Sequence, residues 1–196
     1  KYMGMVNKKS TLYLILFSFF FVTCWSLGYS TLNRYSPDLL MGLSDTAIYY
    51  SLVENGLGSI EYDLNNRSNR ILVPLIARMI YLCIPTFGTW DPIGHALLIT
   101  TSVFSSLAAL LIFNLSLKMF NNVYLSLIAS FLYLTNFIVI NWYLVGGVDS
   151  AWSLCCIALF YILVEKKYYL LPFLSVLATI TKEHFLLFGL LIIFLW

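Results

Sequence analysis

The segment "GLSDTAIYYSLVENG", Gly42 to Gly56, carries an acid and a tyrosine at helical spacing inside a strongly apolar chain. Asp45 and Tyr49 are one helical turn apart, so a helix would place both side chains on one face. A carboxylate in that position can accept a hydrogen bond from a hydroxyl group and take its proton, which is general-base chemistry. The same spacing fits a helix at a membrane interface that Ser44 caps, that "NG" at Asn55 and Gly56 ends and that a tyrosine anchors. The pair alone leaves both interpretations open.

Two arginines in "NNRSNR" could act with this acid on an anionic substrate. Arg67 and Arg70 precede an apolar run, where the free N–H groups at the start of a helix also favour anions. Arginine forks suit phosphate and carboxylate groups in particular. The alternative is that both side chains reach out to lipid headgroups.

Three more charged residues lie close to apolar runs. Asp149 follows two glycines in "NWYLVGGVDSAWS" and could contact a substrate or cap the next helix. Lys182 and Glu183 follow "YYLLPFLSVLATIT", which covers only ~21 Å at helical rise. Charges at that depth indicate function, although a mutual Lys182–Glu183 pair would be structural. Carboxylates also suit Mg²⁺ or Mn²⁺, so Asp45 and Asp149 are candidate metal ligands, but two distant acids do not define a site.

The composition places this chemistry in a membrane. Hydrophobic residues make up 61% of the 196 residues and charged residues only 10%, against about 25% charged in soluble domains. We therefore expect a multi-pass protein of the cell membrane. The net charge of +2 is small and the basic residues are scattered, which argues against a nucleic-acid partner.

The apolar runs predict an all-α fold, a polytopic transmembrane helix bundle. We expect spans at 11–29, 93–117, 123–145, 149–164 and 168–181, with a partial span at 184–196. Residues 30–91 would form a large first outer loop that carries short interfacial helices. The last run covers only ~20 Å of a hydrocarbon core of ~30 Å. We therefore expect the sequence to be the N-terminal part of one module, with a C-terminal part missing.

The segment "ILVPLIARMIYLCIPTFG" decides the topology. It carries Arg78 near its middle, and a central arginine costs about 2.5 to 3.5 kcal/mol on insertion scales. If 71–84 does not span, the lysines all lie on the cytoplasmic side: Lys1, Lys8, Lys9, Lys118, Lys166 and Lys167. If it spans, the last three lie outside. We therefore expect this segment to lie along the outer interface, which puts the acids, arginines and tyrosines on the outer side.

The order of these features resembles the GT-C superfamily of polytopic glycosyltransferases. An outer-loop "SD" is followed by a tyrosine, an arginine leads into "ILVPLIA", and a later "FG" closes that helix. An aspartate follows in the next outer loop, and "LATITKE" ends the fifth span. The pattern covers nearly the whole chain and is most similar to bacterial members related to protein O-mannosyltransferases and the lipid A aminoarabinose transferase. It departs from the family where Ser44 replaces the first of two paired acids and where "VPL" replaces a double proline.

The resemblance implies transfer of a sugar from a polyprenyl-phosphate-linked donor to an envelope glycan, lipid or protein on the outer side of the cytoplasmic membrane. Asp45 matches the first-loop acid, which acts as base or orients the acceptor hydroxyl. Arg67, Arg70 and Lys182 become candidates for the donor phosphate, and Tyr49 for shaping the pocket. Asp149 and Glu183 would complete the substrate site. A divalent cation, Mg²⁺ or Mn²⁺, is the cofactor to test.

A polytopic transporter or flippase segment is the alternative. It would explain the layout of spans and would use Lys182 and Glu183 as an intramembrane pair. Such proteins often contain internal repeats and broken helices near the membrane midplane, and the sequence shows no internal repeat.

Overall fold

The computed structural model describes residues 2–32, 45–56, 70–84 and 91–195, and these residues form helices and no strands. The all-α prediction is confirmed for this part of the chain. The α-helices are α1 (Tyr2–Leu32), α3 (Thr46–Asn55), α4 (Leu72–Cys83), α5 (Pro92–Phe120), α6 (Val123–Leu134), α7 (Asp149–Val164), α8 (Leu171–Thr181) and α9 (Phe185–Leu195). A π-helical turn, η3 (Val139–Tyr143), and a 3₁₀ turn, η4 (Tyr168–Leu170), complete them.

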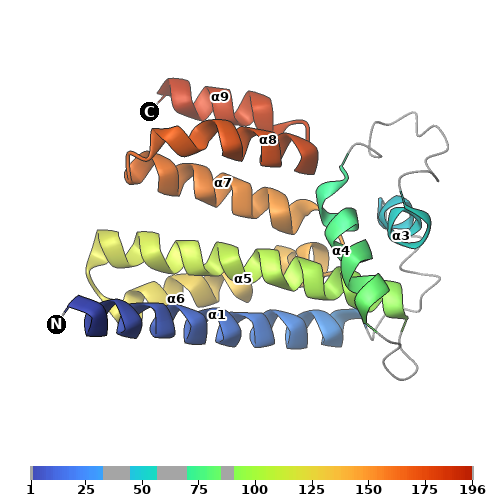
Figure 1. Ribbon diagram of the computed structural model, residues 1–196, viewed down its shortest axis with the longest axis horizontal. Helices are drawn as coiled ribbons and strands as arrows, with labels where there is room; N and C mark the ends of the chain where they lie inside the picture. Colours follow the sequence, from blue (N-terminus) through green and yellow to red (C-terminus); the bar gives the residue numbers. More distant parts are fainter. Residues whose placement is uncertain (1, 33–44, 57–69, 85–90, 196) are drawn as a thin grey trace.

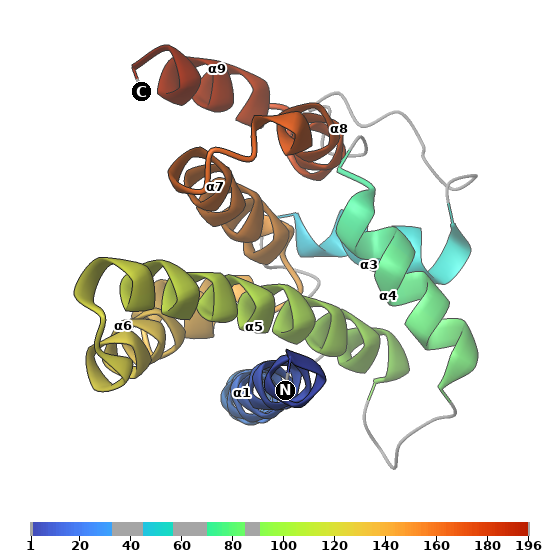
Figure 2. The ribbon, with the colours of Figure 1, turned by 60° about the vertical axis from the view of Figure 1, so that its left-hand side comes forward.

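The long helices run side by side and alternate in direction, and α3 and α4 lie at one end of them (Figure 1). The start of α1, the end of α9 and the turns that follow α5 and α7 lie at the opposite end. Helix α5 runs opposite to α1, which is the arrangement expected if the segment between them does not span. Figure 2 shows α4 crossing the bundle end, where it contacts α3, α5 and α8.

Helix α5 is the centre of the bundle and contacts α1, α4, α6 and α7. Its buried positions include many small or hydroxylated side chains: Ala96, Thr100, Thr101, Ser102, Ser105, Ser106, Ala108 and Ala109. Small residues let helix backbones approach closely. At one such contact the Ser130 hydroxyl of α6 donates to the Ala109 carbonyl of α5 at 3.0 Å.

Large apolar side chains point outward instead. Exposed examples on α1, α6, α8 and α9 are Leu14, Val22, Ile128, Leu132, Phe173, Val176, Leu187, Leu190 and Phe194. By length and composition, two described helices could cross a membrane, namely α1 from Ser10 to Leu32 and α5, which is mostly buried. The other apolar helices are shorter.

The helix bounds follow the expected segments, with one interruption. The run expected as a single span at 123–145 is divided, because α6 ends at Leu134 and only the short turn η3 continues it. The Asn136 side chain accepts a hydrogen bond from the Ile138 amide at 2.9 Å. Such a local contact competes with the helical ladder and accounts for the break. The short helices expected in the first outer loop are α3 and α4.

Candidate functional site

Asp45 lies at the N-terminus of α3, but its carboxylate makes no capping hydrogen bond to the helix. Its Oδ2 instead accepts a hydrogen bond from Nη1 of Arg70 at 3.2 Å. The Tyr49 hydroxyl lies 3.5 Å from the same oxygen. The predicted shared face of Asp45 and Tyr49 is confirmed. Ser44, the expected cap, lies outside the described residues.

Arg70 joins two carboxylates that are far apart in the sequence. Its Nε and Nη2 donate to Oε2 and Oε1 of Glu183 at 3.2 and 2.8 Å, while Nη1 contacts Asp45. The Arg70 side chain is only 11% exposed. Its hydrogen bonds lower the pKa of Glu183 to about 2, and pairing with Glu183 raises the pKa of Arg70 above its ordinary value. Both groups are therefore charged at neutral pH.

A second ion pair joins α7 to the end of α8. Nζ of Lys182 donates to Oδ1 of Asp149 at 2.7 Å and lies 5.4 Å from the ring centroid of Trp152. Asp149 is in the first turn of α7, whose N-cap is Val148, and no side chain caps this helix. The capping hypothesis for Asp149 is therefore wrong. Its carboxylate accepts a hydrogen bond from Lys182 instead.

Lys182 and Glu183 pair with different partners and not with each other. Helix α8 ends at Thr181, and Lys182 has an extended backbone with φ −161° and ψ 119°. Successive side chains on extended backbone point to opposite sides. Lys182 thus faces Asp149, while Glu183 faces Arg70. The mutual pair that the transporter alternative used is wrong.

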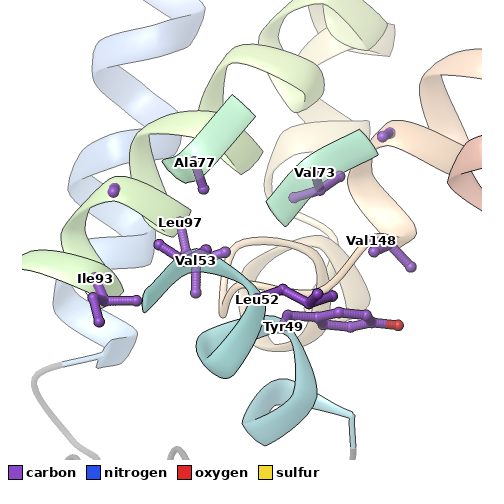
Figure 3. Packing of buried hydrophobic residues seen from close by; sticks show 10 residues of the cluster. Tyr49, Leu52, Val53, Val73, Ala77, Ile93, Leu97 and Val148 are labelled. Atoms are coloured by element: carbon purple, nitrogen blue, oxygen red, sulfur yellow. The ribbon is translucent and has the colours of Figure 1, made fainter. Parts of the chain in front are cut away.

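Tyr49 lies beside the ion pair of Asp45 and Arg70. It is 2% exposed and belongs to a buried cluster that includes Val148 before α7 and Ala151 within it. Figure 3 shows its ring in the same cluster as Leu52 and Val148. Burial raises the pKa of Tyr49 to about 12; a hydrogen bond with Arg70 opposes this, and the charges of Asp45 and Asp149 add to it. Its hydroxyl is therefore neutral at neutral pH.

The structure thus brings most of the predicted site residues together at one end of the bundle. Those with direct contacts in this cluster, called the charged site below, are Asp45, Tyr49, Arg70, Asp149, Lys182 and Glu183. Arg67 lies outside the described residues. The described residues contain no group of three or more His, Cys, Asp or Glu side chains that could hold a metal ion. Asp45 and Asp149 each contact a cationic side chain instead of each other.

Sequence reasoning missed two contacts that hold α3 beside the charged site. Nη1 of Arg78 donates to the carbonyls of Val53 and Glu54, at 2.7 Å each. The Tyr50 hydroxyl donates to Oδ1 of Asp91 at 2.7 Å. The sequence analysis considered Arg78 only for the free-energy cost of inserting it into a membrane. The predicted end of the helix at "NG" was the available signal for the Arg78 contact. The last carbonyls of a helix have no partner within it and need donors from elsewhere.

Comparisons with protein-family models, curated proteins and solved structures found no match to this chain. The class of site is therefore defined by its own groups. It is a cluster of paired charges at one end of an all-helical bundle, with carboxylates that can accept from a hydroxyl and cations that can bind an anion.

Proposed function

We propose that the chain belongs to a membrane glycosyltransferase of the GT-C type. It would transfer a sugar from a polyprenyl-phosphate-linked donor to an acceptor on the outer side of the cytoplasmic membrane. The observation that carries the proposal is the position of Arg70, which contacts both Asp45 and Glu183. Sugar transfer from a lipid phosphate needs a carboxylate beside the acceptor hydroxyl, to take its proton, and cations beside the leaving phosphate. The contacts of Arg70 keep carboxylates and a cation together in this way.

The distribution of side chains supports a membrane location. Hydroxylated and small residues line the inside of α5, whereas large apolar side chains cover the outward faces of α1, α6, α8 and α9. A soluble protein rarely exposes so much apolar surface, and helices packed in lipid use small residues at their interfaces. The lysines at the ends of α5 and α7 would then face the cytoplasm, and the charged site the outside.

In the proposed reaction, Asp45 accepts the proton of the acceptor hydroxyl as its oxygen attacks the anomeric carbon. The bond from that carbon to the phosphate oxygen breaks, and the bonding electrons leave with the lipid phosphate. Arg70 and Lys182 stabilise the charge that develops there. The proton on Asp45 then passes to water.

Donor binding in this scheme requires an exchange of partners. The Arg70 donors are engaged by Glu183 and Asp45 in the described structure. Glu183 is 41% exposed and Asp45 18%, so Glu183 is the carboxylate that a phosphate from outside meets first. Replacement of Glu183 by the phosphate keeps the charge of Arg70 compensated. Withdrawal of Arg70 from Asp45 removes a competing donor, so that carboxylate can accept a hydrogen bond from the acceptor hydroxyl.

The remaining site residues have supporting roles. Tyr49 shapes the pocket, and the contact of its hydroxyl with Oδ2 of Asp45 keeps that carboxylate in place. Asp149 orients Lys182 or contacts the acceptor, and Arg67 is a further candidate for the donor phosphate. Mg²⁺ or Mn²⁺ could bind the carboxylates of Asp45 and Asp149 once their cationic partners turn to the donor.

The experiment is transfer of a labelled sugar from polyprenyl phosphate by the purified full-length protein in nanodiscs. Product should form in the parental protein and be lost when Asp45 is replaced by Asn. A transporter would move the labelled lipid between leaflets of a vesicle and form no new glycoside. That outcome would reject the glycosyltransferase.

A further inference from the structure

Helix α3 brings Asp45 and Tyr49 to the charged site, yet its other end is held by a residue outside that site. The Gly56 amide already occupies the Leu52 carbonyl at the end of α3. The next two carbonyls, of Val53 and Glu54, accept hydrogen bonds from Nη1 of Arg78 in α4, each at 2.7 Å. A cation at this position satisfies carbonyls that have no partner within the helix and complements the helix dipole.

A second polar contact fixes the middle of α3. The Tyr50 hydroxyl donates to Oδ1 of Asp91 at 2.7 Å. The same carboxylate caps α5 by accepting from the amides of Ile93 and Gly94 at 3.3 and 2.9 Å. Asp91 is thus part of the start of α5 and is not a free surface acid, so Tyr50 is joined to the central helix of the bundle.

Between these contacts, α3 packs through an apolar face. Figure 3 shows Tyr49, Leu52 and Val53 of α3 next to residues of α4, α5 and the segment before α7. The other labelled members of this buried cluster are Val73, Ala77, Ile93, Leu97 and Val148. Apolar packing is non-directional, so it leaves small sliding movements of α3 inexpensive. The two hydrogen-bonded contacts are directional, so the same movements would break them.

We propose that Arg78 and Tyr50 are positioning residues for Asp45. They fix where α3 lies along its own axis, and so the place of its N-terminal carboxylate relative to Arg70 and the bound donor. Neither side chain belongs to the charged site, and Arg78 acts across the length of a helix of 10 residues, about 15 Å. This inference rests on the proposed function, because it assigns Asp45 to the reaction. A misplacement of about 1 Å can cost about 10²-fold in rate.

The main test compares three variants of the full-length protein in nanodiscs. Arg78→Met keeps a long side chain but loses both hydrogen bonds, and its turnover should fall about tenfold or more. Its affinity for polyprenyl phosphate should stay at the parental value, because the phosphate ligands are outside α3. Arg78→Lys keeps a cationic donor and should restore most of the turnover. Lys118→Met removes a cation from the ion pair at the opposite end and should leave turnover unchanged.

Tyr50→Phe provides a second variant with a smaller structural change. It removes one hydroxyl, while the two amide contacts of Asp91 keep the start of α5 intact, and turnover should fall with donor affinity unchanged. Hydrogen exchange at the α3 amides measures the same contacts without any reaction. Exchange there should speed up in Arg78→Met and Tyr50→Phe and stay at the parental rate in Lys118→Met.

The exchange measurement separates the two proposals. A parental protein that transfers no sugar would reject the glycosyltransferase, and α3 exchange would then report whether Arg78 and Tyr50 hold the helix. Parental turnover and exchange in Arg78→Met would overturn the positioning role. So would a loss of donor affinity as large as the loss of turnover, because the change would then act through the phosphate site or the fold.

Discussion

The two ends of the bundle both carry ion pairs, but these pairs differ in construction. At one end, Nζ of Lys118 contacts Oε1 of Glu165 at 2.6 Å, with the two side chains 50% and 23% exposed. At the other end, Arg70 is 11% exposed and contacts two carboxylates at once. Lys182 and Asp149 add a second pair, and the Tyr49 hydroxyl lies 3.5 Å from Oδ2 of Asp45.

The contrast separates charges that solvent can replace from charges that need each other. An exposed pair contributes little, because water and salt screen each partner. Removal of one partner from a partly buried network leaves the other charge uncompensated. The end with the Lys118–Glu165 pair, called the simple end below, is therefore expected to tolerate substitution. The charged site is expected to respond strongly.

The largest contrast expected is one of sidedness, because the proposed topology puts the two ends in different compartments. In a cysteine-free background, Glu54→Cys at the end of α3 should react with an impermeant thiol reagent applied from outside. Lys118→Cys should react only after the membrane is opened. Labelling of Lys118→Cys from outside would reverse the topology and with it the outward position of the charged site.

Asp45→Asn should have the largest effect on activity. The substitution removes the proton acceptor but keeps the side-chain shape, and Arg70 retains its forked contact with Glu183. Turnover should fall about 10²-fold or more, with donor affinity maintained. Glu54→Gln is the matched control, since it neutralises an exposed acid of the same helix. Sugar transfer by Asp45→Asn at the parental rate would remove Asp45 from the reaction.

Arg70→Ala and Lys182→Ala test the anion-binding half of the charged site. Loss of a charge-assisted hydrogen bond to the donor phosphate should weaken binding by roughly 1.5 to 3 kcal/mol. Affinity for a short-chain polyprenyl phosphate, measured by calorimetry in detergent, checks this directly. Lys118→Ala gives the comparison at the other end. Parental affinity in both site variants and in Arg67→Ala would leave the phosphate without a cationic ligand.

The sequence predicted much of this arrangement because its local patterns are strong. The apolar runs located the helices, and "NG" at Asn55 and Gly56 marked the end of α3, where Gly56 has φ +78°. Helical spacing placed Asp45 and Tyr49 on one face. The unbroken span expected at 123–145 was not found, because a side-chain contact at Asn136 competes with the helix.

The pairing of charges could not be predicted, because it depends on contacts distant in sequence. Lys182 and Glu183 are neighbours, yet the extended backbone after α8 sends them to different partners. Arg70 and Glu183 are separated by 113 residues, and no periodic pattern links such positions. The role of Arg78 could be recognised only from the packing of α3 against α4, which brings its guanidinium to the carbonyls of Val53 and Glu54.

A pH titration sharpens the contrast through Glu183. Hydrogen bonding to Arg70 lowers the pKa of Glu183 from 4.5 to about 2, so the folded protein holds this carboxylate charged where an unfolded chain protonates it. The resulting stabilisation is complete above about pH 4.5 and disappears as the pH falls towards about 2. The excess in Tm of the parental protein over Glu183→Gln should shrink across that window. An excess that grows on acidification would contradict the ion pair.

The smallest effect is expected for Lys118→Ala at the simple end. Its pair with Glu165 is short, at 2.6 Å, but half of the Lys118 side chain is exposed, and water replaces the lost contact. Hydrogen bonding to Lys118 lowers the pKa of Glu165, and Glu165 remains charged at neutral pH after the substitution. Sugar transfer, donor affinity and Tm at neutral pH should all match the parental protein. A loss of turnover comparable to that of Lys182→Ala would mean that the two ends act together, and the contrast between an inert and a reactive end would fail.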